Sequence, residues 1–261
     1  MRKSILIVEW IRYALKSKNA FKIHSPFVYD FYNNCFKSKT TASSQEIIKS
    51  IRKELLNNHI KIFHNDLGAG SKTLSKNNLS ISALAKSSLK NINEASFISR
   101  IIQFTNAKTV VELGTSFGTT ALLINLENPE TELFTIEGSQ EIANVAKKIF
   151  DSKANKNLHL LKGNFDEIFP ELMNKIKNAD AFIFDGNHRY EATLRYFEIA
   201  LKYSKNNSVF IFDDIRWSEE MLNAWKEIKA NKNVTITLDF FTMGVIFISS
   251  GFSKQNFSLR K

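Results

Sequence analysis

From residue 95 to residue 249 the chain alternates between segments typical of buried β-strands and segments typical of α-helices. Each strand-like segment is a short apolar run, and most are followed by a longer stretch with apolar residues at helical spacing. The expected helices are 95–105, 118–126, 140–151, 189–204 and 217–230, and the expected strands are 108–113, 131–136, 157–161, 180–185, 207–213, 234–239 and 243–249. This alternation predicts a parallel sheet with helices on both faces.

The last two expected strands, 234–239 and 243–249, are separated by too few residues for a helix. A connection that short requires an antiparallel hairpin. The expected fold class is therefore α/β: a doubly wound sheet of seven strands that ends in an antiparallel hairpin.

The N-terminal part of the sequence lacks this alternation of strands and helices. Residues 1–60 show apolar residues at helical spacing, and residues 64–93 are polar and rich in Ser, Asn and Lys, with one short helix expected around 80–88. We therefore divide the chain into an N-terminal helical extension with a linker, 1–93, and a sheet domain, 94–261. Asp66, Gly68 and Gly70 form either a loop that folds over a site or a surface turn.

The expected compartment follows from the N-terminus and the cysteine count. The first apolar run stops at Glu9, which makes it too short for a signal-peptide core or a membrane span. Cys35 is the one cysteine, so no internal disulfide can form. A cytoplasmic protein is the default expectation.

The net charge of +10 is concentrated in residues 1–100, which hold 17 Lys+Arg against 6 Asp+Glu. A basic segment can attract an anionic substrate, a nucleic acid or a membrane surface. The alternative is a compositional bias, because Lys, Asn, Ile and Phe are frequent throughout. No arginine-rich run or basic–aromatic repeat is present, so a nucleic-acid partner is not favoured.

Four acidic residues end four of the expected strands: Glu112, Glu137, Asp185 and Asp213. Ligands of doubly wound sheets bind outside the carboxyl ends of the strands. The acids are therefore expected to share one edge of the sheet and to form a site there.

The first of these strands runs into a glycine-containing loop, VVELGTSFGTTA, in which Gly114 and Gly118 precede a helix that starts at Thr119. Glycines there allow close backbone approach to a ligand, and the helix start offers free N–H donors. An ordinary strand–helix turn is the alternative interpretation. Glu137, at the end of the next strand, is placed to accept the hydroxyls of a ribose. The dinucleotide pattern G-x-G-x-x-G does not fit, because Ser116 stands at its middle glycine.

The pattern Glu-x-Gly-x-x-x-Gly, the acid at the end of the second strand and the terminal hairpin together resemble the class I S-adenosylmethionine-dependent methyltransferases, from about Glu94 to Ser250. The resemblance implies a Rossmann-like domain in which the loop 114–118 passes the methionine part of the cofactor, Glu137 holds the ribose, and Asn164 and Phe165 flank the adenine. The family often has Asp where Asn164 stands. The implied cofactor-binding residues are Glu112, Gly114, Thr115, Ser116, Gly118, Thr119, Glu137, Gly138, Asn164, Phe165, Asp185 and Gly186.

Within that class, the ends of two strands resemble the metal-dependent O-methyltransferases of the catechol and caffeoyl-CoA type. Asp185 matches the Asp that ends one strand, and Asp213–Asp214 matches the Asp–Asn pair that ends the next, with Asp214 departing from the Asn. The tract DDIRW, with Trp217, is also similar. Oxygen ligands of this kind suit Mg²⁺ or Ca²⁺. The resemblance therefore implies a divalent cation held by Asp185, Asp213 and Asp214.

The same enzymes have a lysine three residues after the first metal-binding Asp, acting as general base, and His188 stands at that position here. An imidazole titrates near neutral pH and can accept a hydroxyl proton. His188 is therefore the candidate base, and His188 and Asp185 are the two candidate catalytic residues. A metal ligand and a helix-capping residue are the alternative roles for His188.

We therefore expect an enzyme that methylates a hydroxyl of a small molecule. A metal-independent methyltransferase, a nucleic-acid or protein methyltransferase on the same fold, and a non-catalytic module that binds a nucleotide cofactor are the alternatives. The N-terminal helices are expected either to cover the substrate or to form a homodimer contact.

Overall fold

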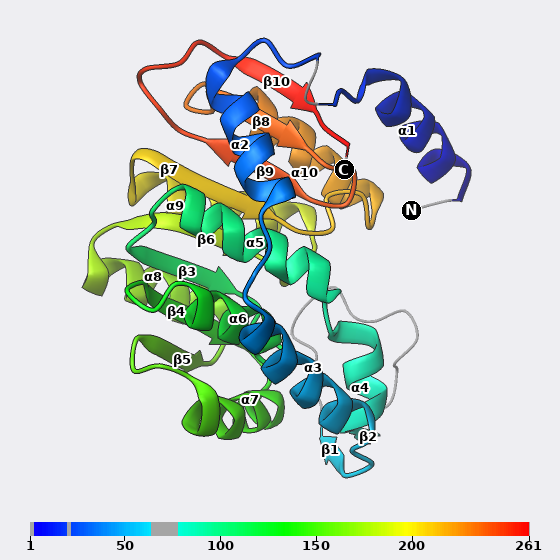
Figure 1. Ribbon diagram of the computed structural model, residues 1–261, viewed down its shortest axis with the longest axis vertical. Helices are drawn as coiled ribbons and strands as arrows, with labels where there is room; N and C mark the ends of the chain where they lie inside the picture. Colours follow the sequence, from blue (N-terminus) through cyan, green and yellow to red (C-terminus); the bar gives the residue numbers. More distant parts are fainter. Residues whose placement is uncertain (1–2, 20–21, 64–77, 261) are drawn as a thin grey trace.

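In a computed structural model that describes residues 3–19, 22–63 and 78–260, the chain forms an eight-stranded sheet covered by helices (Figure 1). The strands are β3 Thr109–Leu113, β4 Glu132–Glu137, β5 Leu158–Lys162, β6 Ala179–Phe184, β7 Ser204–Phe212, β8 Ile236–Asp239, β9 Gly244–Phe247 and β10 Gln255–Ser258. Their order across the sheet is β10-β8-β9-β7-β6-β3-β4-β5. A separate antiparallel pair consists of β1 Lys61–Phe63 and β2 Asn78–Ser80.

The predicted α/β class, the parallel centre and the terminal hairpin are confirmed. β4, β5, β6 and β7 all run parallel to β3, while β9 pairs antiparallel with β7 and with β8. The predicted count of seven strands is one too low, because β10 adds to the edge by pairing parallel with β8. The sequence of β10, QNFS, is largely polar, as an edge strand allows, and so lacks the apolar run that marked the other strands.

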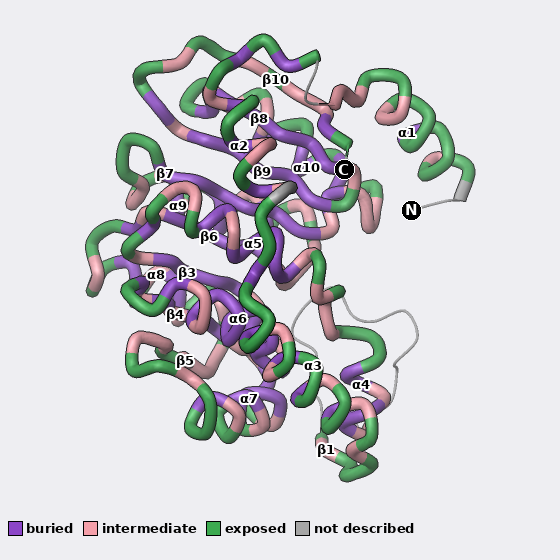
Figure 2. The backbone as a smooth tube through the Cα atoms, in the orientation of Figure 1, coloured by how far each residue is buried: buried purple, intermediate pink, exposed green. Residues whose placement is uncertain are grey.

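Alternate residues of the central strands face opposite layers of helices. Val110 and Ile183 pack in one cluster of buried residues, and their neighbours Val111 and Phe184 pack in the other. The first layer holds α2 Pro26–Lys37, α3 Ala42–Leu56, α4 Ile81–Ser88, α5 Ile92–Phe104, α6 Thr119–Glu127 and α7 Gln140–Lys153, and the second holds α8 Phe165–Ile176, α9 Tyr190–Lys202 and α10 Glu219–Ala230. Figure 2 shows the buried strands between helices that are exposed on their outer sides.

Helix α8 was not among the helices expected from the sequence. Pro170 lies inside it and removes one backbone hydrogen bond, which argues against a helix at that point. The helix forms because Asn164 caps its first turn by accepting from the N–H of Asp166, and because Phe169 and Met173 are buried against the sheet.

The N-terminal helices pack on the sheet domain through aromatic contacts. The ring of Phe27 lies 4.9 Å from that of Phe247, and the ring of Phe31 lies 6.2 Å from that of Phe97. The short helix expected around 80–88 is confirmed as α4. The suggested loop over the site, at Asp66, Gly68 and Gly70, lies outside the described residues.

Helix α1, Lys3–Lys16, lies at the outside of the molecule (Figure 1). It is held by Glu9, which pairs with Arg216 at 3.7 Å, and by Tyr13, whose hydroxyl donates to the backbone carbonyl of Leu259. Six large apolar residues of α1 are exposed: Leu6, Ile7, Val8, Trp10, Ile11 and Leu15. The homodimer contact expected from these helices stays a prediction. None of the described helices is long and apolar enough to cross a bilayer.

Asp239 carries a buried ion pair that joins the hairpin to the loop after β7. Its carboxylate accepts two hydrogen bonds from Arg216, at 2.9 and 2.8 Å, and one from the indole N–H of Trp225 at 3.1 Å. Breaking a buried pair from one side leaves an uncompensated charge, so we expect Asp239→Asn to lower the free energy of unfolding by about 3 kcal/mol in urea denaturation. As a matched control, Asp151→Asn breaks the exposed pair with Lys147 and should cost less than about 1 kcal/mol. Equal losses in the two variants would contradict the assignment.

Candidate active site

The four acids predicted to share one edge of the sheet come from four neighbouring parallel strands. β7, β6, β3 and β4 are adjacent in that order. Asp185 directly follows β6 and Asp213 directly follows β7, and the residues before them, Phe184 and Phe212, are paired in register. The two aspartates therefore lie side by side, with Glu112 and Glu137 on the next two strands. We call this edge the carboxyl rim.

The loop after β3 touches the loop after β6 through backbone atoms. Gly114 has φ +106°, and a Cβ placed on it would lie 2.2 Å from the carbonyl oxygen of Asp185. A Cβ on Gly186 would lie 2.7 Å from the ring of Phe165 and 3.4 Å from the Cα of Gly114. Three of the predicted cofactor segments, 114–118, 164–165 and 185–186, therefore meet, and only glycine fits where they touch.

Glu137 holds the loop after β3 in place. Its Oε2 accepts from the backbone N–H of Ser116 at 2.7 Å, and its Oε1 accepts from the N–H of Ser139, beyond Gly138, at 2.9 Å. A carboxylate oxygen has more than one acceptor site, so both oxygens can still receive hydroxyl groups. Glu137 is thus a loop anchor in addition to the predicted ribose contact.

Two threonines named with the loop lie beneath it. Thr115 is buried, and its hydroxyl hydrogen-bonds that of Thr135 at 2.6 Å. Thr119, also buried, is the first residue of α6, and Gly118 before it caps that helix with φ +78°. The Thr115 hydroxyl and the start of α6 therefore stabilise the loop.

Glu112 is fully buried below the same loop. Its Oε2 accepts from the hydroxyl of Thr135 at 2.5 Å, while its Oε1 is buried and has no hydrogen-bond partner among the described residues. Burial raises the pKa of Glu112 to about 7, against the opposing effects of the Thr135 hydrogen bond and of Lys90. An orphaned buried carboxylate oxygen suits a cationic ligand group.

Lys90, between α4 and α5, reaches the carboxyl rim from the N-terminal part of the chain, and it was not among the predicted site residues. Its ammonium lies 3.1 Å from Oδ2 of Asp185 and donates to Oδ2 of Asp213. Burial alone would lower the pKa of Lys90, but the two carboxylates raise it above its ordinary value. Burial raises the pKa of Asp185 despite Lys90, whereas the Lys90 ammonium outweighs burial at Asp213 and lowers its pKa. The cluster therefore keeps a protonated amine at the rim.

Asp214 and His188 lie next to this cluster. The His188 Nε2 is 3.9 Å from Oδ2 of Asp214, and the imidazole is 6.2 Å from the ring of Trp217. The third predicted metal ligand thus approaches the imidazole. Within the described part of the chain, no group of three or more His, Cys, Asp or Glu side chains is arranged to hold a metal ion. The donor set therefore does not fit a divalent cation in this conformation.

Three of the seven non-glycine residues with positive φ in the described part of the chain lie at the same edge. Ser116, Asn187 and Asp214, in the loops after β3, β6 and β7, have φ of 50°, 49° and 53°. Such conformations cost about 1 kcal/mol or more each and cluster at functional sites. At Asn187 the side-chain amide donates to the hydroxyl of Tyr196 at 3.1 Å, while its Oδ1 is buried without a hydrogen-bond partner among the described residues.

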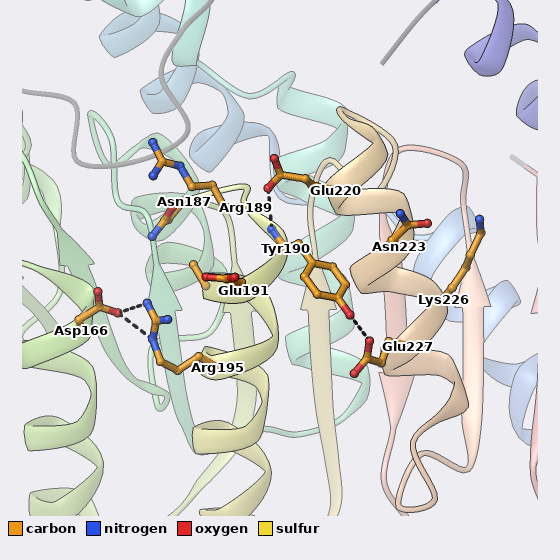
Figure 3. A pocket seen from close by; sticks show the side chains of 11 residues that line it. Asp166, Asn187, Arg189, Tyr190, Glu191, Arg195, Glu220, Asn223, Lys226 and Glu227 are labelled. Carbon is orange, nitrogen blue, oxygen red and sulfur yellow. Dashed lines mark hydrogen bonds and ion pairs between the residues drawn. The ribbon is translucent and has the colours of Figure 1, made fainter.

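A polar cleft of ≈ 940 Å³ opens beyond Asn187, between the first turns of α9 and α10 (Figure 3). Arg195 pairs with Asp166 at 2.7 Å on one wall, and the backbone N–H of Tyr190 donates to Glu220 at 3.1 Å on the other. Of the loop after β6, residues 185–188, Asn187 lines the cleft. None of the residues predicted to bind cofactor or metal or to act in catalysis lines it. The cleft adjoins the carboxyl rim without coinciding with it.

The raised pKa of Glu112 makes the stability of the fold depend on pH, and replacing Glu112 by Gln should remove this dependence. A carboxyl whose pKa is raised by folding binds more protons in the folded state, so ionising it destabilises the fold as pH rises from about 4.5 to about 7. We expect the stability of the wild type to fall relative to Glu112→Gln by up to roughly 3 kcal/mol over this window, measured by urea denaturation at several pH values. Parallel stability profiles for the two proteins would contradict the raised pKa.

Comparisons with known proteins agree with this geometry. Residues 111–215, from β3 to the loop after β7, match a family model described as a methyltransferase domain. A curated relative, the uncharacterized protein R132 of Acanthamoeba polyphaga mimivirus, is 27% identical over 132 residues, which cover 47% of this chain and 60% of that protein. The match thus spans less than two thirds of the relative's length.

Solved structures share the fold at low identity. An O-methyltransferase from Bacillus cereus in complex with SAH superposes with a TM-score of 0.58 at 14% identity, covering 80% of this chain and 92% of that one. An SAH-bound methyltransferase from Podospora anserina gives a TM-score of 0.60 at 11% identity, covering 87% and 97%. An O-methyltransferase of tomaymycin synthesis from Streptomyces achromogenes, in complex with SAM, gives 0.55 at 16% identity, covering 62% and 82%. Residues 111–215 are therefore similar to a methyltransferase domain, and the sheet has the fold seen in these SAM- and SAH-bound methyltransferases.

Proposed function

We propose that the protein transfers the methyl group of S-adenosylmethionine to a hydroxyl oxygen of a small molecule, with His188 as the general base. The observation that carries the proposal is the meeting of the loop 114–118 with the loop 185–188 at the carboxyl rim. This contact brings the carboxylate of Glu137, the orphaned carboxylate oxygen of Glu112 and the imidazole of His188 to one edge of the sheet. The O-methyltransferases with the same fold support oxygen as the acceptor.

The residues present fit S-adenosylmethionine. The orphaned Oε1 of Glu112 offers an acceptor to the ammonium of the methionine part, and the carboxylate of Glu137 offers acceptors to the ribose hydroxyls. The ring of Phe165 packs against Gly186 and provides an apolar surface for the adenine. Asn164 has its carbonyl oxygen engaged as the cap of α8, so its amide N–H groups are what it can offer to the adenine.

Bound S-adenosylmethionine supplies an electrophilic methyl group on a sulfonium ion. His188 then has one task, which is to accept the proton of the acceptor hydroxyl as the oxygen forms its bond to the methyl carbon. The ring is half-buried between Asp214 and Trp217, which fixes its position at the rim. Positioning of this kind supplies much of the rate in a two-reactant transfer.

Cofactor binding tests the first part of the proposal. In calorimetry we expect S-adenosylhomocysteine to bind and NAD not to bind. We expect Glu137→Gln to lower the affinity for S-adenosylhomocysteine at least about tenfold, because the variant loses the charged acceptors and the loop anchor. The control is Glu171→Gln, on the exposed side of α8, which should leave the affinity unchanged. NAD binding, or an unaffected Glu137 variant, would contradict the assignment.

Turnover tests the base. A panel of phenols, alcohols and carboxylic acids is screened for release of S-adenosylhomocysteine, and His188→Gln is compared with the wild type on the best acceptor. We expect kcat to fall about 100-fold or more, because general-base catalysis is lost, with the affinity for S-adenosylhomocysteine within about twofold. An unchanged kcat would assign proton removal to another group, and a lost cofactor affinity would assign a structural role to His188.

A further inference from the structure

Lys90 occupies the position between the two carboxylates that the sequence assigned to a metal. Its ammonium lies 3.1 Å from Asp185 and is hydrogen-bonded to Asp213, and its side chain is only 7% exposed. A buried ammonium is unfavourable unless charged partners compensate it. Here the partners are the two aspartates at the ends of the adjacent strands β6 and β7. The contact is therefore built into the rim of the sheet.

A divalent cation bound to the same oxygens would need the same space. Mg²⁺ binds carboxylate oxygens at about 2.1 Å and Ca²⁺ at about 2.4 Å, so a cation bridging Asp185 and Asp213 would lie where the ammonium now lies. The Asp214 carboxylate lies 3.9 Å from His188, and among the described residues no third His, Cys, Asp or Glu side chain completes a metal-binding group with Asp185 and Asp213. Lysine and metal are thus alternatives at one position.

We propose that the Lys90 ammonium is the resident cation of the carboxyl rim and that methyl transfer in this protein needs no divalent metal. The proposal rests on the proposed function, and it answers how an acceptor oxygen is held without a metal. An ammonium has three N–H donors, of which the two carboxylates account for two. The remaining N–H is the group that binds the acceptor oxygen.

The reaction balances with the residues named. The acceptor hydroxyl gives its proton to His188, the oxygen forms a bond to the methyl carbon, and the carbon–sulfur bond breaks with its electron pair left on sulfur. The products are the methyl ether, S-adenosylhomocysteine and one proton, which His188 releases to water. Lys90 stabilises the negative charge that develops on the oxygen and undergoes no net change itself.

Metal binding tests the proposal without an acceptor. Mn²⁺ is titrated calorimetrically into wild type, Lys90→Ala, Lys90→Ala/Asp185→Asn and the surface control Lys86→Ala. We expect no saturable binding by wild type or by Lys86→Ala up to about 1 mM Mn²⁺, and binding at least about tenfold tighter by Lys90→Ala, because removing the ammonium frees two carboxylates. The double variant should lose that gain. Of the four proteins, only Lys90→Ala should have a higher melting temperature in the presence of Mn²⁺.

Two results of the Mn²⁺ titration would overturn the proposal. One is saturable Mn²⁺ binding by wild type that Asp185→Asn abolishes, and this comparison is sufficient if Lys90→Ala does not fold. The other is a folded Lys90→Ala that binds S-adenosylhomocysteine but no Mn²⁺. Failure of wild type to bind S-adenosylhomocysteine would instead refute the proposed function.

Turnover gives a separate readout once an acceptor is known. EDTA should leave kcat of the wild type unchanged, whereas Lys90→Ala should lower kcat about 100-fold or more because the positive charge at the oxygen is lost. Loss of activity on chelation, restored by Mg²⁺, would overturn the proposal.

Discussion

The contact of Lys90 with Asp185 and Asp213 is the interaction on which the carboxyl rim depends. Asp185 and Asp213 follow two neighbouring parallel strands and are largely buried. The negative charges of two adjacent carboxylates repel each other. The ammonium removes the conflict, and it comes from a segment that precedes the sheet in the chain. Because Lys90 lies between α4 and α5, the same contact ties these two helices to the rim. Charge compensation and placement of the helices are therefore one constraint.

The glycines and the strained residues at the rim have a common cause. The loops after β3 and β6 approach so closely that a Cβ on Gly114 would collide with the backbone of Asp185. Chains that turn this sharply need left-handed conformations, and Ser116, Asn187 and Asp214 adopt them in the loops where three adjacent strands end. The cost is offset by local hydrogen bonds, such as those from Ser116 to Glu137 and from Asn187 to Tyr196. The loops of the rim therefore support one another through backbone contact and hydrogen bonds.

Most of the fold could be predicted because strands and helices alternate with clearly different periods, and the acids at the strand ends located the rim for the same reason. The misses have local causes. β10 is polar and lies at an edge, and α8 contains Pro170, so neither shows the pattern of its class. Lys90 could not be predicted, because Asp213 is 123 residues away and the lysine lies in a polar segment like many others. Only the packing of α4 and α5 against the sheet brings Lys90 and Asp213 together.

The loop after β7 joins the chemistry to the periphery of the molecule. The loop begins with Asp213, which is hydrogen-bonded to Lys90, and with Asp214, which lies near His188. Arg216, two residues further along, pairs with Asp239 on β8 and with Glu9 on α1. Tyr13 of α1 packs on Phe241 at 5.4 Å between ring centres, and Arg216 lies over the same ring. Helix α1 and the hairpin are therefore both linked, through Arg216, to the loop that carries Asp213 and Asp214.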